Sequence, residues 1–186
     1  MEMNTKKNTT VISAFPGTGK SYIHKHQKEL NITCIDSDSS YFHWTVNTPR
    51  TKIRNPNFPT NYIDHIKENL GKYDIIFISS HEDVRREVAK AGIEYTVVYP
   101  TESLRNEYIG RYYNRGNSDE FIKTLDHFFD EWIKSCRNDK NAKIHVELTH
   151  HTEYLSDVIF RLNSLHSPKW EKTKLSSLYG TTCREN

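Results

Sequence analysis

An eight-residue segment near the start of the chain has the composition of a phosphate-binding loop. It reads A-F-P-G-T-G-K-S over residues 14–21. A short β-branched run, TTVISAF, leads into it, and a helical pattern begins at Lys20. Where a strand, a loop and a helix follow one another in this way, successive backbone N–H groups can turn inward around an anion, and the helix N-terminus adds positive potential. The segment therefore predicts a site for the phosphates of a nucleotide.

Individual residues of this segment match particular atoms of ATP. The pattern is that of a P-loop, G-x-x-x-x-G-K-[ST], with Ala14 in place of the first glycine. We expect Lys20 to reach the β- and γ-phosphates and the Ser21 hydroxyl to bind Mg²⁺. The alternative is a Gly-Pro turn with an incidental lysine, which Ala14 favours slightly because alanine there needs a permissive backbone conformation. The residues predicted to bind ATP in this loop are Pro16, Gly17, Thr18, Gly19, Lys20 and Ser21.

Two carboxylates follow the next predicted strand. Residues 32–35 (ITCI) are expected to form that strand, and Asp36-Ser37-Asp38 comes directly after it. In an extended chain, side chains at i and i+2 point the same way, and ligands of parallel sheets bind at the carboxyl ends of the strands. One carboxylate can bind Mg²⁺ while the other accepts the proton of an attacking hydroxyl. We assign Asp36 to the metal and Asp38 to the acceptor, although the sequence does not decide between them; a turn or helix cap is the alternative for both.

The elements that must position these residues alternate between strands and helices. Five short strands interleaved with helices predict an α/β fold, a five-stranded parallel sheet with helices on both faces. A length of 186 residues suits a single domain. Residues 168–186 are expected to form a tail or a packed extension. Strands are expected at residues 9–15, 32–35, 74–80, 95–99 and 143–148, and helices at 20–30, 61–70, 82–91, 101–113, 118–134 and 154–165.

The composition of the chain bears on whether nucleic acid or a membrane is a partner. The 26 basic and 24 acidic side chains leave a formal net charge of +2, so no general basic field indicates a nucleic-acid-binding protein, although a local basic cleft is compatible with it. The three cysteines have no C-x-x-C spacing, which is typical of reduced intracellular thiols. No apolar run is long enough for a signal peptide or a membrane span. We therefore expect a cytoplasmic protein without a membrane partner; the sequence does not indicate its oligomeric state.

The P-loop after the first strand and the D-x-D after the second together resemble the P-loop small-substrate kinase superfamily, which includes shikimate, gluconate and nucleoside monophosphate kinases. The segments AFPGTGK, DSDSS and NPNFPTNYI also resemble uncharacterised phage and bacterial adenylate-kinase-like proteins. The resemblance extends to about residue 165. It implies the P-loop NTPase fold of the nucleotide-kinase type, with ATP and Mg²⁺ as cofactors. The implied reaction is transfer of the γ-phosphoryl group of ATP to a nucleotide, a nucleoside or a similar small hydroxyl acceptor.

The same resemblance implies an acceptor region at residues 41–62 and at the end of the third strand. In the first segment Tyr41 and Phe42 can stack on a base and Arg54 can bind a phosphate, which favours a nucleotide-like acceptor. In the second, His81 and Arg85 are expected on the acceptor side. The alternatives are a hydrophobic flap that packs on the sheet for the aromatic residues and a solvated helix face for Arg85.

A lid is implied at about residues 105–120. Arg111 and Arg115 are four residues apart and share one helix face. In the kinases that the chain resembles, lid arginines close over ATP and neutralise charge on the transferred phosphoryl group. The alternative is a pair of surface arginines stacked on Tyr112 and Tyr113.

Two other functions are compatible with a P-loop. One is a phage-type kinase that acts on hydroxymethylpyrimidine in DNA, for which the aromatic and basic residues 41–62 would suit a flipped base, whereas the small net charge is weak support. The other is a regulatory P-loop ATPase without a small acceptor. The third predicted strand, DIIFISSH, ends without the acidic residue that such ATPases place there. This difference favours a kinase.

Overall fold

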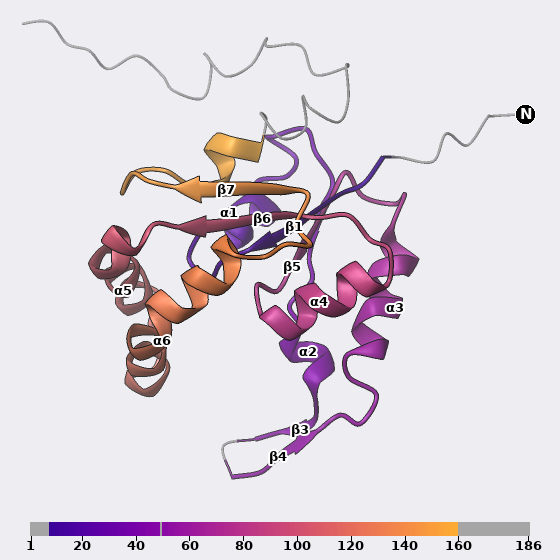
Figure 1. Ribbon diagram of the computed structural model, residues 1–186, viewed down its shortest axis with the longest axis horizontal. Coiled ribbons are helices and arrows are strands. Elements are labelled where there is room, and N and C mark those ends of the chain that lie inside the picture. Colours follow the sequence, from indigo (N-terminus) through magenta and orange to yellow (C-terminus); the bar gives the residue numbers. More distant parts are fainter. Residues whose placement is uncertain (1–7, 49, 160–186) are drawn as a thin grey trace, which may run out of the picture.

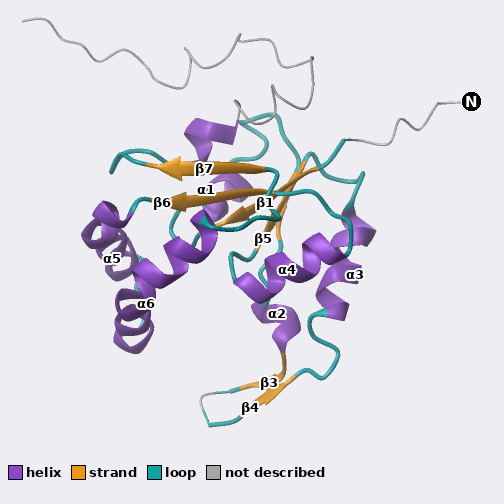
Figure 2. Cartoon of the chain, viewed as in Figure 1, coloured by secondary structure: helices purple, strands orange, loops and turns teal. Residues whose placement is uncertain are grey.

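The computed structural model describes residues 8–48 and 50–159. Its centre is a five-stranded parallel sheet with the order β2-β5-β1-β6-β7 (Figures 1 and 2). The predicted α/β fold with five parallel strands is confirmed. The strands are β1 Thr10–Ala14, β2 Cys34–Asp36, β5 Ile75–Ile78, β6 Thr96–Pro100 and β7 Ile144–Leu148.

The strand that carries the P-loop lies in the middle of this sheet. β1 pairs with β5 on one side, where Thr10 is opposite Ile75, and with β6 on the other, where Ile12 is opposite Thr96. All four residues of β5 are buried, as expected for a parallel strand covered on both faces. The segment after β1 therefore emerges at the centre of the carboxyl edge of the sheet.

Helices cover both faces, as predicted. Side chains alternate along β1, so that Ile12 packs with Ile23 of α1 (Lys20–Lys25) and with Val158 in the helical residues 155–159. Val11 and Phe15 face the opposite side. The helices on that opposite side are α3 (Thr60–Asn69), α4 (Glu82–Lys90), α5 (Arg105–Asn114) and α6 (Asp119–Arg137).

Two segments differ from the sequence prediction. The helix expected over residues 20–30 ends at Lys25, and turns follow up to Asn31, which has a positive φ of 52°. Within residues 41–62 the chain forms a hairpin that was not predicted. This β3–β4 hairpin projects away from the sheet in Figure 1. It consists of β3 (Trp44–Asn47) and β4 (Lys52–Arg54), and the short α2 (Ser40–His43) precedes it, while the 3-10 helix η1 (Glu102–Leu104) precedes α5.

Expectations about a membrane span, the cysteines and the C-terminal tail can be compared with the described residues only in part. No helix among them is both long enough and apolar enough to cross a membrane. Cys34 and Cys136 are buried free thiols. Cys183 and the predicted tail at 168–186 lie outside the described residues.

Candidate functional site

The P-loop conformation is supplied by two glycines. Gly17 and Gly19 have positive φ values of 82° and 106°, a region that residues with a Cβ adopt at a cost. Ala14, which replaces the first glycine of the pattern, is instead the buried last residue of β1 and pairs with Val98. Among the described residues, Asn31 is the one non-glycine residue with a positive φ, so Ala14 needs no unusual backbone conformation.

Lys20 and Thr18 hold the loop together from within. Lys20 Nζ donates to the Ala14 carbonyl at 2.8 Å, and Thr18 Oγ1 donates to the Phe15 carbonyl at 2.8 Å. Burial lowers the pKa of the Lys20 ammonium, while the carboxylates of Asp36 and Asp38 act in the opposite direction. Thr18 is a fully buried residue of the loop and does not line the cavity described below. Lys20 is thus a cation beside two carboxylates in a partly desolvated place.

The carboxylates at the end of β2 face the P-loop. Ser21 Oγ donates to Asp36 Oδ2 at 3.4 Å, which brings the two predicted metal ligands together. Asp38 Oδ1 accepts from the backbone N–H of Ser40 at 2.9 Å, so Asp38 also has the turn-forming contact that was the alternative interpretation. Among the described residues no cluster of three or more His, Cys, Asp or Glu side chains could hold a metal ion.

A buried tyrosine that sequence analysis missed fixes this end of the sheet. Tyr62 of α3 donates its hydroxyl to the Ser37 carbonyl at 2.6 Å and accepts from the Ser79 N–H at 3.3 Å. Its side chain is fully buried, and burial raises the pKa of its phenol. Tyr62 therefore joins the ends of β2 and β5. Its position in the first turn of a predicted helix gave no signal of this role, because the partners are backbone groups distant in sequence.

One open cavity of about 770 Å³ connects these groups. Its walls come from the P-loop, the end of β2, the end of β5 and the region of α5 and α6, and Tyr154 also lines it. The structure thereby brings together most of the residues predicted for the site. Those that line the cavity are Pro16, Gly17, Gly19, Lys20, Ser21, Asp36, Asp38, His81, Arg111 and Arg115.

Arg111 is held against the P-loop. Its guanidinium lies between the rings of Tyr108 and Tyr154, 4.5 and 4.1 Å from their centroids. Nη1 donates to the Gly17 carbonyl at 3.1 Å and Nη2 to the His151 carbonyl at 2.6 Å. Arg111 therefore stacks on tyrosines, but not on the pair expected from the sequence. Arg115, one turn later, is exposed at the cavity.

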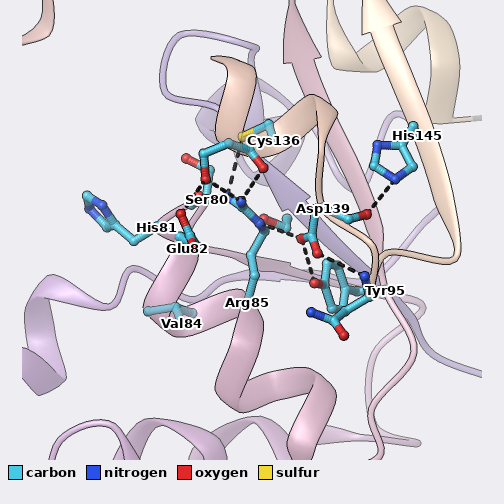
Figure 3. A network of polar contacts seen from close by, with 12 residues as sticks. Ser80, His81, Glu82, Val84, Arg85, Tyr95, Cys136, Asp139 and His145 are labelled. Atoms are coloured by element: carbon cyan, nitrogen blue, oxygen red, sulfur yellow. Dashed lines mark hydrogen bonds and ion pairs between the residues drawn. The ribbon is translucent and has the colours of Figure 1, made fainter. Parts of the chain in front are cut away.

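Arg85 lies elsewhere, in a buried polar network behind the end of β5 (Figure 3). Only 2% of its side chain is exposed, and Nε contacts Asp139 Oδ2 at 2.6 Å. Its Nη atoms donate to the carbonyls of Ser80 and Ser135. Although burial acts to raise it, hydrogen bonds from Tyr95 and Arg85 hold the pKa of Asp139 below its usual range. Arg85 therefore lies neither on the acceptor side nor on a solvated helix face, the two places considered from the sequence. A buried guanidinium needs a paired carboxylate, and Asp139 is that partner.

Three residues expected in the acceptor region do not line the cavity. Tyr41 is 81% exposed beside it, and Arg54 is exposed on β4. Phe42 packs on Tyr62 and His65, with ring centroids 5.2 and 4.7 Å apart, as in the hydrophobic-flap alternative. The sequence of residues 41–62 has no regular period, so it does not indicate which of its aromatic side chains point towards the cavity.

Comparison with known proteins bears on the fold. No protein-family model and no curated protein matches the sequence. Among solved structures, the tunicamycin resistance protein of Deinococcus radiodurans is similar with a TM-score of 0.57 and 11% identity, over 87% of this chain and 96% of that one. A gluconokinase from Sinorhizobium meliloti 1021 has a TM-score of 0.48 and 12% identity over 89% and 98% of the two chains. A shikimate kinase from Aquifex aeolicus vf5 has a TM-score of 0.43 and 16% identity over 85% and 98%.

The low identities limit the conclusion to architecture. The sheet is parallel, its middle strand leads into a P-loop, and helices pack on both faces. The similarity to the Deinococcus protein extends over nearly the whole of both chains. The chain therefore has an α/β fold similar to that of the Deinococcus protein.

Proposed function

We propose that this chain is an ATP-dependent kinase that transfers the γ-phosphoryl group to the hydroxyl of a nucleotide, a nucleoside or a similar small acceptor. The observation that supports this most is that one cavity, of about 770 Å³, is lined by groups predicted to bind ATP, the metal and the acceptor. It places the P-loop on one wall and the carboxylates of Asp36 and Asp38 on another, with Arg111 and Arg115 beside them. Two reactants need to meet in one partly enclosed space for phosphoryl transfer.

On the nucleotide side, the P-loop N–H groups and Lys20 would bind the phosphate chain of ATP. The Ser21 hydroxyl and the Asp36 carboxylate fit Mg²⁺, which takes one or two protein oxygens in addition to phosphate and water oxygens. When bound, Mg²⁺ supplies positive charge to the β- and γ-phosphates. Arg111, fixed over the loop, would flank the nucleotide.

On the acceptor side, Asp38 would orient the attacking hydroxyl and accept its proton. The hydroxyl oxygen forms a bond to the γ-phosphorus, the bond from that phosphorus to the bridging β–γ oxygen breaks, and ADP leaves. Arg115 would neutralise charge on the transferred group. It is exposed at the end of α5 and lines the same cavity as the P-loop.

One observation favours a second acceptor class, a hydroxymethylpyrimidine within DNA. The 25 residues between Asp38 and Asp64 contain Arg50, Lys52 and Arg54 and no acidic residue. All three cations are exposed on or beside the β3–β4 hairpin. Such a hairpin would attract a phosphate backbone. A small free acceptor has no need of it.

A coupled ADP-release screen tests the proposal. Mg-ATP would be supplied with nucleosides, nucleoside monophosphates, sugar acids or hydroxymethylated single-stranded DNA. We expect one class to raise ADP release sharply, and Lys20→Ala to remove the response. Slow ADP release that no acceptor changes would instead support a regulatory ATPase. A response to DNA alone would select the second acceptor class.

A further inference from the structure

Tyr112 of α5 presents a buried hydroxyl to the P-loop. The residue is 1% exposed and lines the cavity. Its hydroxyl has no hydrogen-bond partner among the described residues. A Cβ placed on Gly17 would lie 2.9 Å from Tyr112 Oη, so this oxygen is pressed against the loop backbone where phosphates are expected.

A buried hydroxyl without a partner is costly, which makes a partner in the ligand-bound protein favourable. The charged side chains that act on Tyr112 are Arg115 and Arg111, and both are cations. Burial raises the pKa of the Tyr112 phenol, so the hydroxyl stays neutral and keeps its proton at neutral pH. A neutral donor flanked by cations suits an anionic acceptor and disfavours a cation.

We propose that Tyr112 Oη donates a hydrogen bond to a phosphate oxygen of the nucleotide that binds at the P-loop. This inference rests on the proposed nucleotide site and adds a phosphate-binding residue to it. It also explains why position 17 carries glycine. Any side chain there would occupy the space between Tyr112 and the loop, and the backbone φ of 82° disfavours one as well.

Tyr108 provides a matched control on the same helix. It lies one turn earlier, is fully buried, and its hydroxyl likewise has no hydrogen-bond partner among the described residues. Unlike Tyr112, it is not among the residues that line the cavity. Replacement by phenylalanine keeps the ring of either residue and removes only the oxygen.

The test is calorimetric titration of the full chain and of Tyr112→Phe and Tyr108→Phe with two probes, in the presence of Mg²⁺. One probe is the non-hydrolysable β,γ-imido analogue of ATP, and the other is inorganic tripolyphosphate, which has no sugar or base. We expect Tyr112→Phe to bind both probes about tenfold more weakly, since one hydrogen bond to a charged group is lost. Its thermal midpoint without ligand should be unchanged or higher, and Tyr108→Phe should bind both probes as the wild type does.

Three outcomes in the variants would overturn the inference and leave the nucleotide site in place. One is wild-type affinity of Tyr112→Phe for both probes. Another is weaker binding of the ATP analogue alone, which would place the contact on the sugar or base. The third is equal losses in both tyrosine variants, which would indicate altered helix packing. If the wild type binds neither probe, the nucleotide site itself fails and the inference with it.

Discussion

Two walls of the cavity are held in different ways. The wall proposed to bind phosphate, here called the phosphate wall, is mostly one continuous segment, residues 14–21. Its shape follows from two glycines with positive φ and from contacts within the loop. The wall proposed to bind the acceptor, here called the acceptor wall, is formed by the ends of β2 and β5. Tyr62 of α3 connects these two strand ends by hydrogen bonds to Ser37 and Ser79. The first wall is local in sequence, whereas the second depends on contacts over long distances along the chain.

Two arginines, Arg111 and Arg85, show how contacts between distant segments decide which side chains reach the cavity. Both Arg111 and Arg85 were expected in the site, and both are largely buried, with 9% and 2% of their side chains exposed. Arg111 stays at the cavity because the neighbouring P-loop offers the Gly17 carbonyl as an acceptor. Arg85 points away from it, because its carboxylate partner, Asp139, lies in the buried network behind the end of β5 (Figure 3). Both partners are distant in sequence, by 94 residues for Gly17 and 54 for Asp139, so no local pattern indicates which arginine reaches the cavity.

The largest effect should come from the phosphate wall. Lys20→Ala should lower phosphoryl transfer about 10⁴-fold, because the cation beside the phosphates is lost. The rate of ADP release with acceptor measures this. Lys25→Ala, at the exposed end of the same helix, is the matched control and should keep wild-type rates. Lys20→Ala should keep the wild-type circular dichroism spectrum; transfer at near the wild-type rate would contradict the role of the P-loop.

The second effect concerns stability rather than chemistry. Arg85→Met should lower the free energy of unfolding by about 3–4 kcal/mol, because Asp139 would remain as a buried carboxylate without its cation. Arg86→Met, on the exposed side of the same helix, should change it by less than about 0.5 kcal/mol. Urea unfolding followed by tryptophan fluorescence measures both. Equal stability of the two variants would mean that the buried pair of Arg85 and Asp139 does not stabilise the fold.

A third effect should separate the two walls kinetically. Asp36→Asn and Asp38→Asn should each lower kcat about 10²-fold while changing the KM for ATP much less, since the carboxylates act on the metal and the acceptor. Steady-state kinetics with the acceptor found by screening measures this split. Asp64→Asn, exposed on α3, is the control for loss of one negative charge. Unchanged kcat in both variants would remove the acceptor assignment from this wall.

The smallest effect should come from the residue that connects the strands. Tyr62→Phe leaves the Ser37 carbonyl without its buried donor, which should lower the free energy of unfolding by about 1–2 kcal/mol. The KM for the acceptor should rise several-fold while the KM for ATP stays constant. Kinetics over both substrates can show this. A larger change in the KM for ATP would mean that the two walls are not independent.

The sequence predicts the sheet and the phosphate wall because both carry strong local signals. The apolar run of β5 and the strand–loop–helix order around Lys20 predict their structures from adjacent residues alone. The β3–β4 hairpin was missed because residues 41–62 have no period of two and are interrupted by prolines. The position of Phe42 and the partners of Tyr62 depend on packing between segments, which no local pattern reports.

The fate of the γ-phosphoryl group tests the central proposal most directly. Mg-ATP labelled at the γ-phosphate would be incubated with the protein and with the acceptor class that raises ADP release, and the label would be measured in acceptor and in inorganic phosphate. We predict that the label appears in the acceptor in an amount equal to the ADP formed, and that Lys20→Ala prevents this. Label found only in inorganic phosphate, with or without acceptor, would contradict a kinase and indicate an ATPase.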